Sequence, residues 1–232
     1  MKTCIIRVAR NVSLSVVALV VAGCATTEQV RSAKTSGFLG DYSQLHPGKG
    51  DQAKLVYLDP SADFGKYHTV MIDPVQLWAS EDKTTTLGKL SREEQQLLVD
   101  YLYVSLHDAL EKDYLIVKEP GPDVLRLRCA ITEARAAAPV RDLISNVTPF
   151  GLGITYAKRI VLGTHTAVGI VSVEGELLDG GTGQRLAAAV DRRAGTKVLR
   201  GKFSRWGDVK DAFDFWARRL QTRLAELRAH QD

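Results

Sequence analysis

The clearest pattern in the chain is an alternation of apolar and polar residues in its second half. Over 124–133 the apolar side of this alternation consists of Leu125, Leu127, Cys129 and Ile131. The stretch 168–178 alternates in the same way, and after a turn at 179–183 the chain returns over 185–193. A period of two is typical of half-buried strands. The pattern therefore predicts one strand followed by a β-hairpin, with the turn glycines supplying positive φ.

Two other stretches repeat apolar residues every three or four positions, which indicates amphipathic helices. The first follows Ser91-Arg92-Glu93-Glu94, a capping-box pattern, and its apolar residues are Leu98, Tyr101, Leu102, Ala109 and Leu110. The second follows Asp208, its predicted N-cap, and its apolar residues are Val209, Phe213, Trp216, Leu220, Leu224 and Leu227. With two further strands over 67–73 and 114–118, we predict an α+β domain. In it, both amphipathic helices pack on one face of a mainly antiparallel sheet.

Two stretches have no regular period. Around 37–45, Phe38, Leu39, Tyr42 and Leu45 indicate an apolar segment, named the strap below, that lies on the main domain; a partner-binding segment is the alternative. Residues 144–169 mix glycine, apolar and basic residues. Long irregular connections are often functional, so a mobile functional loop over 144–166 is one interpretation. A helix and a strand obscured by glycine are the other.

The first residues of the chain have the form of an export signal. Lys2, Arg7 and Arg10 precede a mostly apolar run over 12–22, which is followed by Gly23-Cys24. A charged segment, a short apolar segment and a small-residue cleavage site are the parts of such a signal. The apolar run is too short for the ~20 residues that cross a bilayer. The pattern resembles a bacterial lipobox, so we predict cleavage between Gly23 and Cys24 and lipid, such as palmitate, on Cys24.

This assignment divides the chain into three parts. Residues 1–23 are a signal peptide, 24–36 are the lipidated cysteine with a flexible polar tether, and 37–232 are a single periplasmic α+β domain. Ala25, in place of the Asp that retains lipoproteins in the inner membrane, favours the outer membrane. The protein is then attached to the membrane through lipid on Cys24 and faces the periplasm of the bacterial cell envelope.

Charge and cysteine content narrow the function classes further. The leader has no acidic residue and carries three of the four net positive charges, so the remaining 209 of the 232 residues are close to neutral. Nucleic-acid binding usually needs a clustered basic face, and we predict no such partner. Cys129 is the one cysteine outside the leader and the lipobox, so no internal disulfide forms. Its position on the apolar side of a strand predicts a small core residue.

The sequence contains no motif that identifies a catalytic or metal centre. The five histidines lack the His-Glu-x-x-His spacing, and neither a Gly-x-Ser-x-Gly turn nor a phosphate-binding loop is present. Four aspartates at turns or strand ends could supply paired carboxylates for a hydrolase: Asp41, Asp59, Asp63 and Asp73. Ordinary turn residues are the simpler interpretation, so we predict no enzyme, cofactor or metal.

Several short motifs occur in a fixed order behind the lipobox. They are Gly37-Phe38-Leu39 with Asp41-Tyr42 and Leu45, Asp63-Phe64 with Tyr67, 70–75 with Trp78, Asp179 with Thr182-Gly183, 191–193, and Trp206-Gly207-Asp208-Val209 with Phe213 and Trp216-Ala217. Together they resemble the bacterial lipoprotein family catalogued as domain of unknown function 3313. The resemblance runs from Gly37 to the last helix. It implies an envelope lipoprotein and carries no catalytic residue.

Three functions remain. The leading one is a non-catalytic binding module for another envelope protein. The second is a subunit of an oligomeric envelope or secretion assembly, with partners contacted through the 144–166 loop and a surface that includes Phe150, Tyr156 and Arg159. The third is a carboxylate-dependent hydrolase. The oligomeric state is left open.

Overall fold

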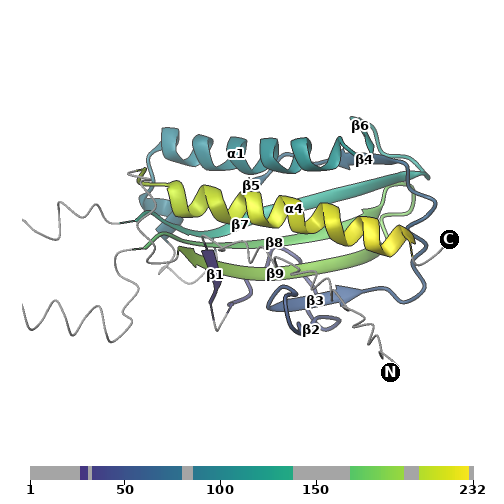
Figure 1. The fold of residues 1–232 in the computed structure, drawn as a ribbon, viewed down its shortest axis with the longest axis horizontal. Helices are drawn as coiled ribbons and strands as arrows, with labels where there is room; N and C mark the ends of the chain where they lie inside the picture. The colour runs from purple at the N-terminus through teal and green to yellow at the C-terminus, as the bar shows by residue number, and fades with distance from the viewer. Residues whose placement is uncertain (1–26, 31–32, 80–85, 138–167, 196–203, 230–232) are drawn as a thin grey trace, which may run out of the picture.

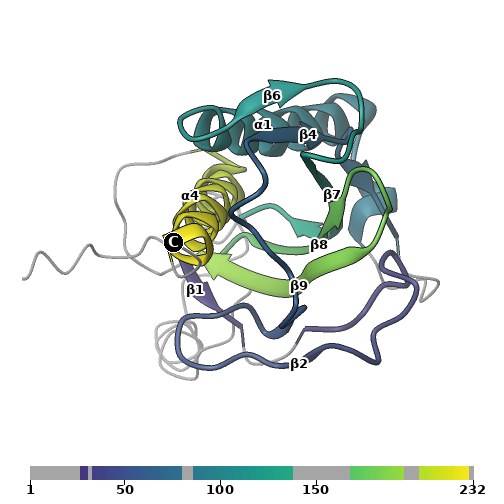
Figure 2. The ribbon, with the colours of Figure 1, turned by 90° about the vertical axis from the view of Figure 1, so that its right-hand side faces the viewer.

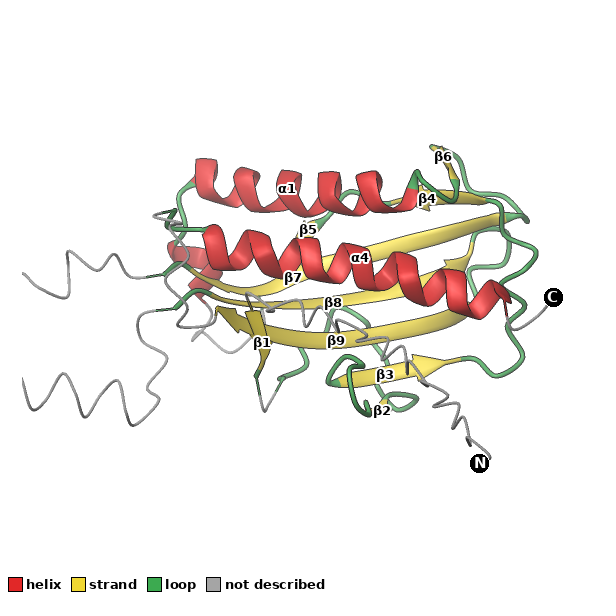
Figure 3. Cartoon of the chain, in the orientation of Figure 1, coloured by secondary structure: helices red, strands yellow, loops and turns green. Residues whose placement is uncertain are grey.

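The structure is a computed structural model that describes residues 27–30, 33–79, 86–137, 168–195 and 204–229. Its elements, in chain order, are β1 (Thr27–Gln29), β2 (His46–Pro47), β3 (Leu55–Leu58), β4 (Thr69–Ile72), β5 (Gln76–Leu77), the 3-10 helix η1 (Thr86–Lys89), α1 (Arg92–Leu110), β6 (Leu115–Val117), β7 (Val124–Arg135), β8 (Ile170–Asp179), β9 (Arg185–Gly195) and α4 (Gly207–Ala229). The long helices lie side by side along the long strands (Figures 1 and 3).

The described strands form one mixed sheet that is mostly antiparallel. Its order is β2-β3-β9-β8-β7-β4-β6, with β1 paired to β9 and β5 paired to β7. The predicted hairpin is confirmed as β8 and β9, and the strand before it is β7. Among the described strands, the parallel pairings are those of β4 with β6 and β7, and of β5 with β7. The mainly antiparallel α+β class is therefore confirmed.

Both predicted helices are present, but they begin differently. Ser91 caps α1 through the expected capping box with Glu94. Asp208 does not cap α4: this helix begins at Gly207, and the Asp208 carboxylate instead accepts a hydrogen bond at 2.8 Å from the Gly169 amide. The carboxylate thereby joins the start of α4 to the start of β8. None of the helices described here is long and apolar enough to cross a membrane.

The turn between β8 and β9 uses its glycines for two different reasons. Gly183 has φ of +75°, a conformation that suits a residue without a Cβ. Gly180 has no positive φ, but a Cβ there would lie 2.7 Å from the Val124 carbonyl oxygen. The prediction of positive φ therefore holds for Gly183, whereas Gly180 permits close packing against the start of β7.

The start of the described chain is folded onto the sheet. Thr27, Glu28 and Gln29 pair with β9, and Thr27 is buried. Arg193 donates hydrogen bonds to the side chain and the carbonyl of Thr27, at 2.9 and 2.6 Å. A flexible tether over 24–36 was therefore a wrong prediction for the described part of that segment. Strand pairing and a buried arginine hold it in place.

Candidate functional site

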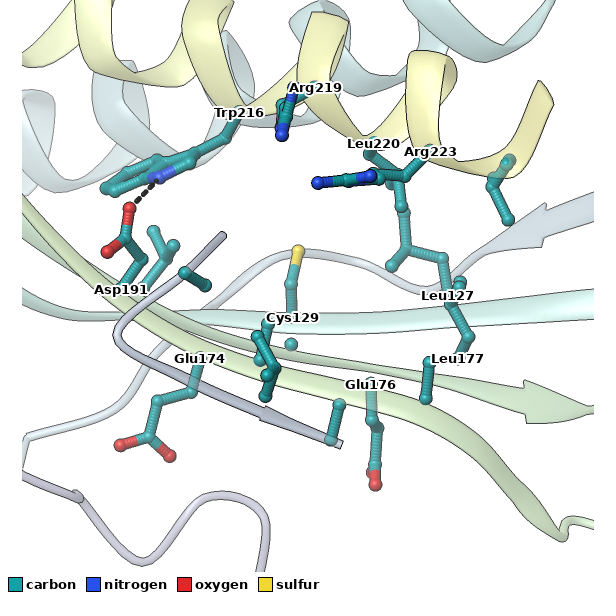
Figure 4. Close-up of a pocket in the computed structure, with 18 of the residues that line it drawn as sticks. Leu127, Cys129, Glu174, Glu176, Leu177, Asp191, Trp216, Arg219, Leu220 and Arg223 are labelled. Atoms are coloured by element: carbon teal, nitrogen blue, oxygen red, sulfur yellow. Dashed lines mark hydrogen bonds between the residues drawn. The ribbon is translucent and has the colours of Figure 1, made fainter. Parts of the chain in front are cut away.

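A cavity of about 390 Å³ lies under α4. It lies between α4, α1 and the three long strands, with Leu127, Cys129 and Leu177 at its floor (Figure 4). Small residues leave this space open, since Gly175 faces Ala189 across β8 and β9 and Ala187 lies two positions along. The residues of α4 that line it recur every three or four positions: Trp216, Leu220, Leu224 and Leu227. The cavity is thus an apolar space formed by large helix residues facing small strand residues.

Two arginines of α4 reach over this space. Arg219 and Arg223 are one helical turn apart, and Figure 4 shows both side chains directed toward the region above Cys129. Both form ion pairs with Asp51 on the loop between β2 and β3, and the Arg223 pair measures 3.0 Å. Arg223 also pairs with Glu226 at 2.6 Å. A pair of guanidinium groups beside an apolar cavity is suited to holding a carboxylate or phosphate.

Asp191 lies at the end of the cavity near Trp216, and its carboxylate is held by several hydrogen bonds. Asp191 is buried and accepts hydrogen bonds from Trp216 Nε1 at 2.8 Å, from Gln29 Nε2 at 2.7 Å and from the Lys54 amide at 3.3 Å. These donors join α4, β1 and the β2–β3 loop to β9. Asp191 therefore holds the wall of the cavity together and has little capacity left to act as a base.

Cys129 lies at the floor of the cavity, and its environment suppresses thiol chemistry. The side chain is buried, as the alternation in β7 predicts. Burial, together with the negative charge of Asp73, raises the pKa of the Cys129 thiol to about 12. The thiol therefore stays protonated at neutral pH, and the prediction of a small core residue is confirmed.

The glutamates of β8 face away from the cavity. Figure 4 shows Glu174 and Glu176 directed to the other side of the sheet, and both are buried there. Glu174 accepts hydrogen bonds from the Ser36 amide and the Tyr42 hydroxyl. Glu176 is held by Arg128 at 2.6 Å and Arg185 at 2.8 Å. Apolar and polar side chains alternate along β8 as the sequence predicts, but the polar side chains are buried under another segment of the chain instead of facing solvent.

The strap is what covers that polar side. Phe38 and Leu39 are buried in a cluster with Ala130, Ala188 and Val190 of the sheet. Arg185 donates hydrogen bonds to the carbonyl of Leu39 at 2.7 Å and to that of Asp41 at 2.8 Å. The prediction that the strap lies on the main domain is confirmed.

The four aspartates considered as catalytic carboxylates each have partners of their own. Ser43 binds Asp41, Ser61 and Gln184 bind Asp59, the Gly65 amide binds Asp63, and Arg126 binds Asp73 through both carboxylate oxygens. Hydrogen bonds from Ser61 lower the pKa of Asp59, which keeps that carboxyl charged. Nothing in these contacts pairs one of the four with another.

One group of possible metal-ligating side chains occurs in the described residues. His107, Asp108 and Glu111 lie together near the end of α1, with ligand atoms within 4.8 Å of one another. His107 Nδ1 is 3.4 Å from the Glu111 carboxylate and 3.6 Å from that of Asp108. His107 is partly exposed and both carboxylates are exposed, and exposed acidic groups commonly lie together without an ion, so we assign no metal to them.

The site residues predicted from the sequence lie elsewhere. Gly23 and Cys24, the 144–166 loop, and Phe150, Tyr156 and Arg159 within it, are all outside the described residues. Periodicity predicts several of the cavity-lining residues, among them Cys129, Trp216 and Leu220, as core positions and does not predict a cavity, although the sequence contains a signal for one. Three consecutive alanines, Ala187–Ala189, stand in a strand opposite the longest helix. Small residues in that position leave room between the layers.

Comparisons with known proteins support a lipoprotein of unknown function. Residues 34–220 match the family model described as "Protein of unknown function (DUF3313)". The "Uncharacterized lipoprotein YdcL" of Escherichia coli strain K12 is 26% identical over 179 residues, which cover 76% of this chain and 78% of YdcL.

Two solved structures are similar to this chain at a lower level. A PelC dodecamer from Paraburkholderia phytofirmans is 14% identical with a TM-score of 0.38, covering 72% of this chain and 94% of that chain. A minor lipoprotein from Acinetobacter baumannii is 7% identical with a TM-score of 0.32, covering 70% of this chain and 95% of that chain. Both likenesses are too weak to carry an argument about function.

Proposed function

Since the chain belongs to the DUF3313 family and a relative from Escherichia coli is an uncharacterized lipoprotein, we propose that it is a non-catalytic binding module of the bacterial cell envelope. Lipid on Cys24 attaches it to the outer membrane, and the folded domain faces the periplasm. Gly23-Cys24 at the end of a short apolar run supports the attachment. Ala25 after the cysteine supports the outer membrane. We propose that its protein partner is another component of the envelope and that the cavity described above holds a small molecule.

The observation that carries a binding role is the apolar cavity with its engaged polar groups. Binding sites are typically apolar hollows of about 300–1,000 Å³ with a few polar groups at defined positions. Among the described residues that line this one, Asp191 has three donors, Arg219 and Arg223 have carboxylate partners, and the thiol of Cys129 is protonated. Such a lining can hold a molecule but offers no activated nucleophile or free general base.

The residues that line this cavity also support the position of both long helices on one face of the sheet. Leu102 and Leu106 of α1 and Leu220 of α4 line it together, over the side chains of Cys129 and Leu177. We propose from this that both helices pack on one face of the sheet, and the views along and across the helices agree with it (Figures 1 and 2).

The attachment is tested by labelling cells with radioactive palmitate. Cys24→Ser should abolish the label and release the protein from the membrane fraction, because the serine hydroxyl is not a substrate for lipid transfer to sulfur. Cys4→Ser, in the leader, is the matched control and should keep the label. Density fractionation of the envelope should place the wild type with the outer membrane. A label retained by the Cys24→Ser variant would exclude this attachment.

The binding role is tested by native mass spectrometry of the full chain released from envelopes. We expect a non-covalently bound molecule in the wild type and in Ala189→Ser, which keeps the cavity open. Ala189→Met places a longer side chain into the cavity and should lose the bound mass. If the wild type and both variants carried the same bound mass, or none, the result would contradict a binding role for this cavity.

A further inference from the structure

We propose that the cavity under α4 binds the single acyl chain of an anionic amphiphile, with the head group held by Arg219 and Arg223. The inference rests on the proposed binding function and names its ligand class. A fatty acid and a phospholipid with one acyl chain share this chemistry, because each combines one apolar chain with a carboxylate or a phosphate.

The lining of the cavity matches an acyl chain. Its floor and walls come from apolar side chains on both long helices and the three long strands, including Leu127 of β7, Leu177 of β8, Leu106 of α1 and Leu220 of α4. Transfer of each methylene from water to such surroundings contributes roughly 0.8 kcal/mol, or about fourfold in affinity. Affinity should therefore rise with chain length until the chain fills the cavity.

Arg219 and Arg223 can bind an anionic head group, since both already bind a carboxylate of the protein. Asp51 already presents a carboxylate to both guanidinium groups. Its side chain is 67% exposed, and the side chain of Arg219 is 26% exposed. Because Asp51 is open to water, solvent weakens its ion pairs, and a ligand carboxylate or phosphate that replaces it leaves no buried carboxylate without a partner. Asp51 thus acts as a weak internal competitor for the head-group position.

The remaining charges around the cavity do not create a second site. Asp191 faces Trp216, Gln29 and Lys54, as described above. Glu226 pairs with Arg223 from the exposed surface of α4. An uncharged amphiphile would leave the two arginines with Asp51 and Glu226 as their only carboxylate partners among the described residues, and a cationic amphiphile would be repelled by them.

The experiment uses the full-length lipoprotein in envelope vesicles and a photoreactive myristic acid with a diazirine at the end of its chain. We expect adducts on Leu127, Cys129 or Leu177, mapped by mass spectrometry of the digested protein. The matching myristyl alcohol should give adducts at least about tenfold weaker, because it lacks the charge-assisted hydrogen bonds to arginine. Adducts confined to exposed surface residues would overturn the proposal.

Three sets of variants test the two halves of the site. Arg219→Gln with Arg223→Gln should weaken labelling by myristic acid at least about tenfold, while Arg218→Gln, on the same helix, should not change it.

Asp51→Asn removes the competitor and should strengthen labelling two- to fivefold, by roughly the energy of an exposed ion pair. Asp108→Asn, exposed on α1, should leave labelling unchanged. Ala189→Met should abolish the deep adducts, and Ala189→Ser should retain them.

Competition by unlabelled myristate or by lysophosphatidylglycerol distinguishes the carboxylate from the phosphate head group, and stronger competition by either one supports the proposal. Equal thermal unfolding midpoints confirm that each variant is folded. Unchanged labelling of the folded double arginine variant would overturn the proposal. A bound molecule of another class in native mass spectrometry would leave the proposed binding function intact and remove only this inference.

Discussion

At the residue scale, the buried carboxylate of Asp179 in the β8–β9 turn binds the turn itself and also the segment before β4. Asp179 accepts hydrogen bonds from Tyr67 Oη at 2.7 Å, Lys66 Nζ at 2.9 Å and the Thr182 amide at 2.8 Å. Burial by itself would raise the pKa of Asp179, but these hydrogen bonds outweigh it and hold the pKa well below its usual range. Burial and the bond to Asp179 raise the pKa of Tyr67 to about 12. The charged carboxylate thus fastens the β8–β9 turn to the segment before β4.

Replacing Asp179 by asparagine should lower the free energy of unfolding by about 2 kcal/mol at pH 7, because the charged acceptor of several donors is lost. The low pKa of the native carboxyl means that its contribution is complete above the unfolded pKa of about 3.9 and is lost as pH falls toward the native value. Urea unfolding at pH 7 and pH 3 measures both effects. The difference between wild type and variant should shrink at pH 3, and an equal difference at both values would contradict this account.

Cys129 provides a second prediction at this scale. Because its pKa is raised to about 12, the folded protein should react with iodoacetamide at least about a hundredfold more slowly than the protein in urea, measured on the peptide that contains Cys129. A cysteine introduced at exposed Leu115 should react rapidly in both states. Similar rates for Cys129 in the two states would show that its thiol is accessible and ionised.

At the element scale, the strap turns the polar side of the hairpin into a second interior. Phe38 packs edge-on against Trp78, with ring centroids 5.7 Å apart, and Arg128 lies over its ring at 5.4 Å. Alternation in β8 predicts the strand and its register, yet it also predicts solvent around Glu174 and Glu176. The periodicity of one strand contains no information about the segment that covers it, whose contacts with Glu174 come from residues 132 and 138 positions earlier in the chain. For this reason the strand was predictable and the burial of its glutamates was not.

Truncation of the strap tests its role. Phe38→Ala should lower the free energy of unfolding by about 3 kcal/mol, because a buried ring is lost and a space is left between the strap and the sheet. It should also make residues 33–47 a preferred site in limited proteolysis. Leu58→Ala, at a residue 45% exposed on β3, should cause little change. Unchanged protease resistance of the Phe38→Ala protein would mean that other contacts hold the strap.

At the scale of the whole molecule, local sequence patterns predict the helices and strands, whereas their arrangement in the sheet and around the cavity depends on long-range contacts. Both long helices, the hairpin and the strand before it follow from periodicity and from the cap at Ser91. The parallel placement of β4 beside β6 and β7 does not, since it depends on which strand lies beside which. The cavity was likewise hidden, because it arises where Gly175 and Ala189 of the sheet meet Trp216 and Leu220 of a distant helix. Residue types at one position cannot show a space that is enclosed by α1, α4 and the three long strands together.

The pairing of β1 with β9 has a consequence for how the molecule can move at a membrane. Thr27 is the third residue after Cys24 and is already held in the sheet. Even a fully extended chain covers only about 11 Å over three residues. If the lipid is on Cys24, the domain therefore has little freedom to rotate or to rise away from the bilayer, and one end of its sheet always faces the headgroups. Breaking the bonds of Arg193 to Thr27 would release more chain and turn a restricted orientation into free tumbling, which fluorescence anisotropy of the membrane-bound protein can follow.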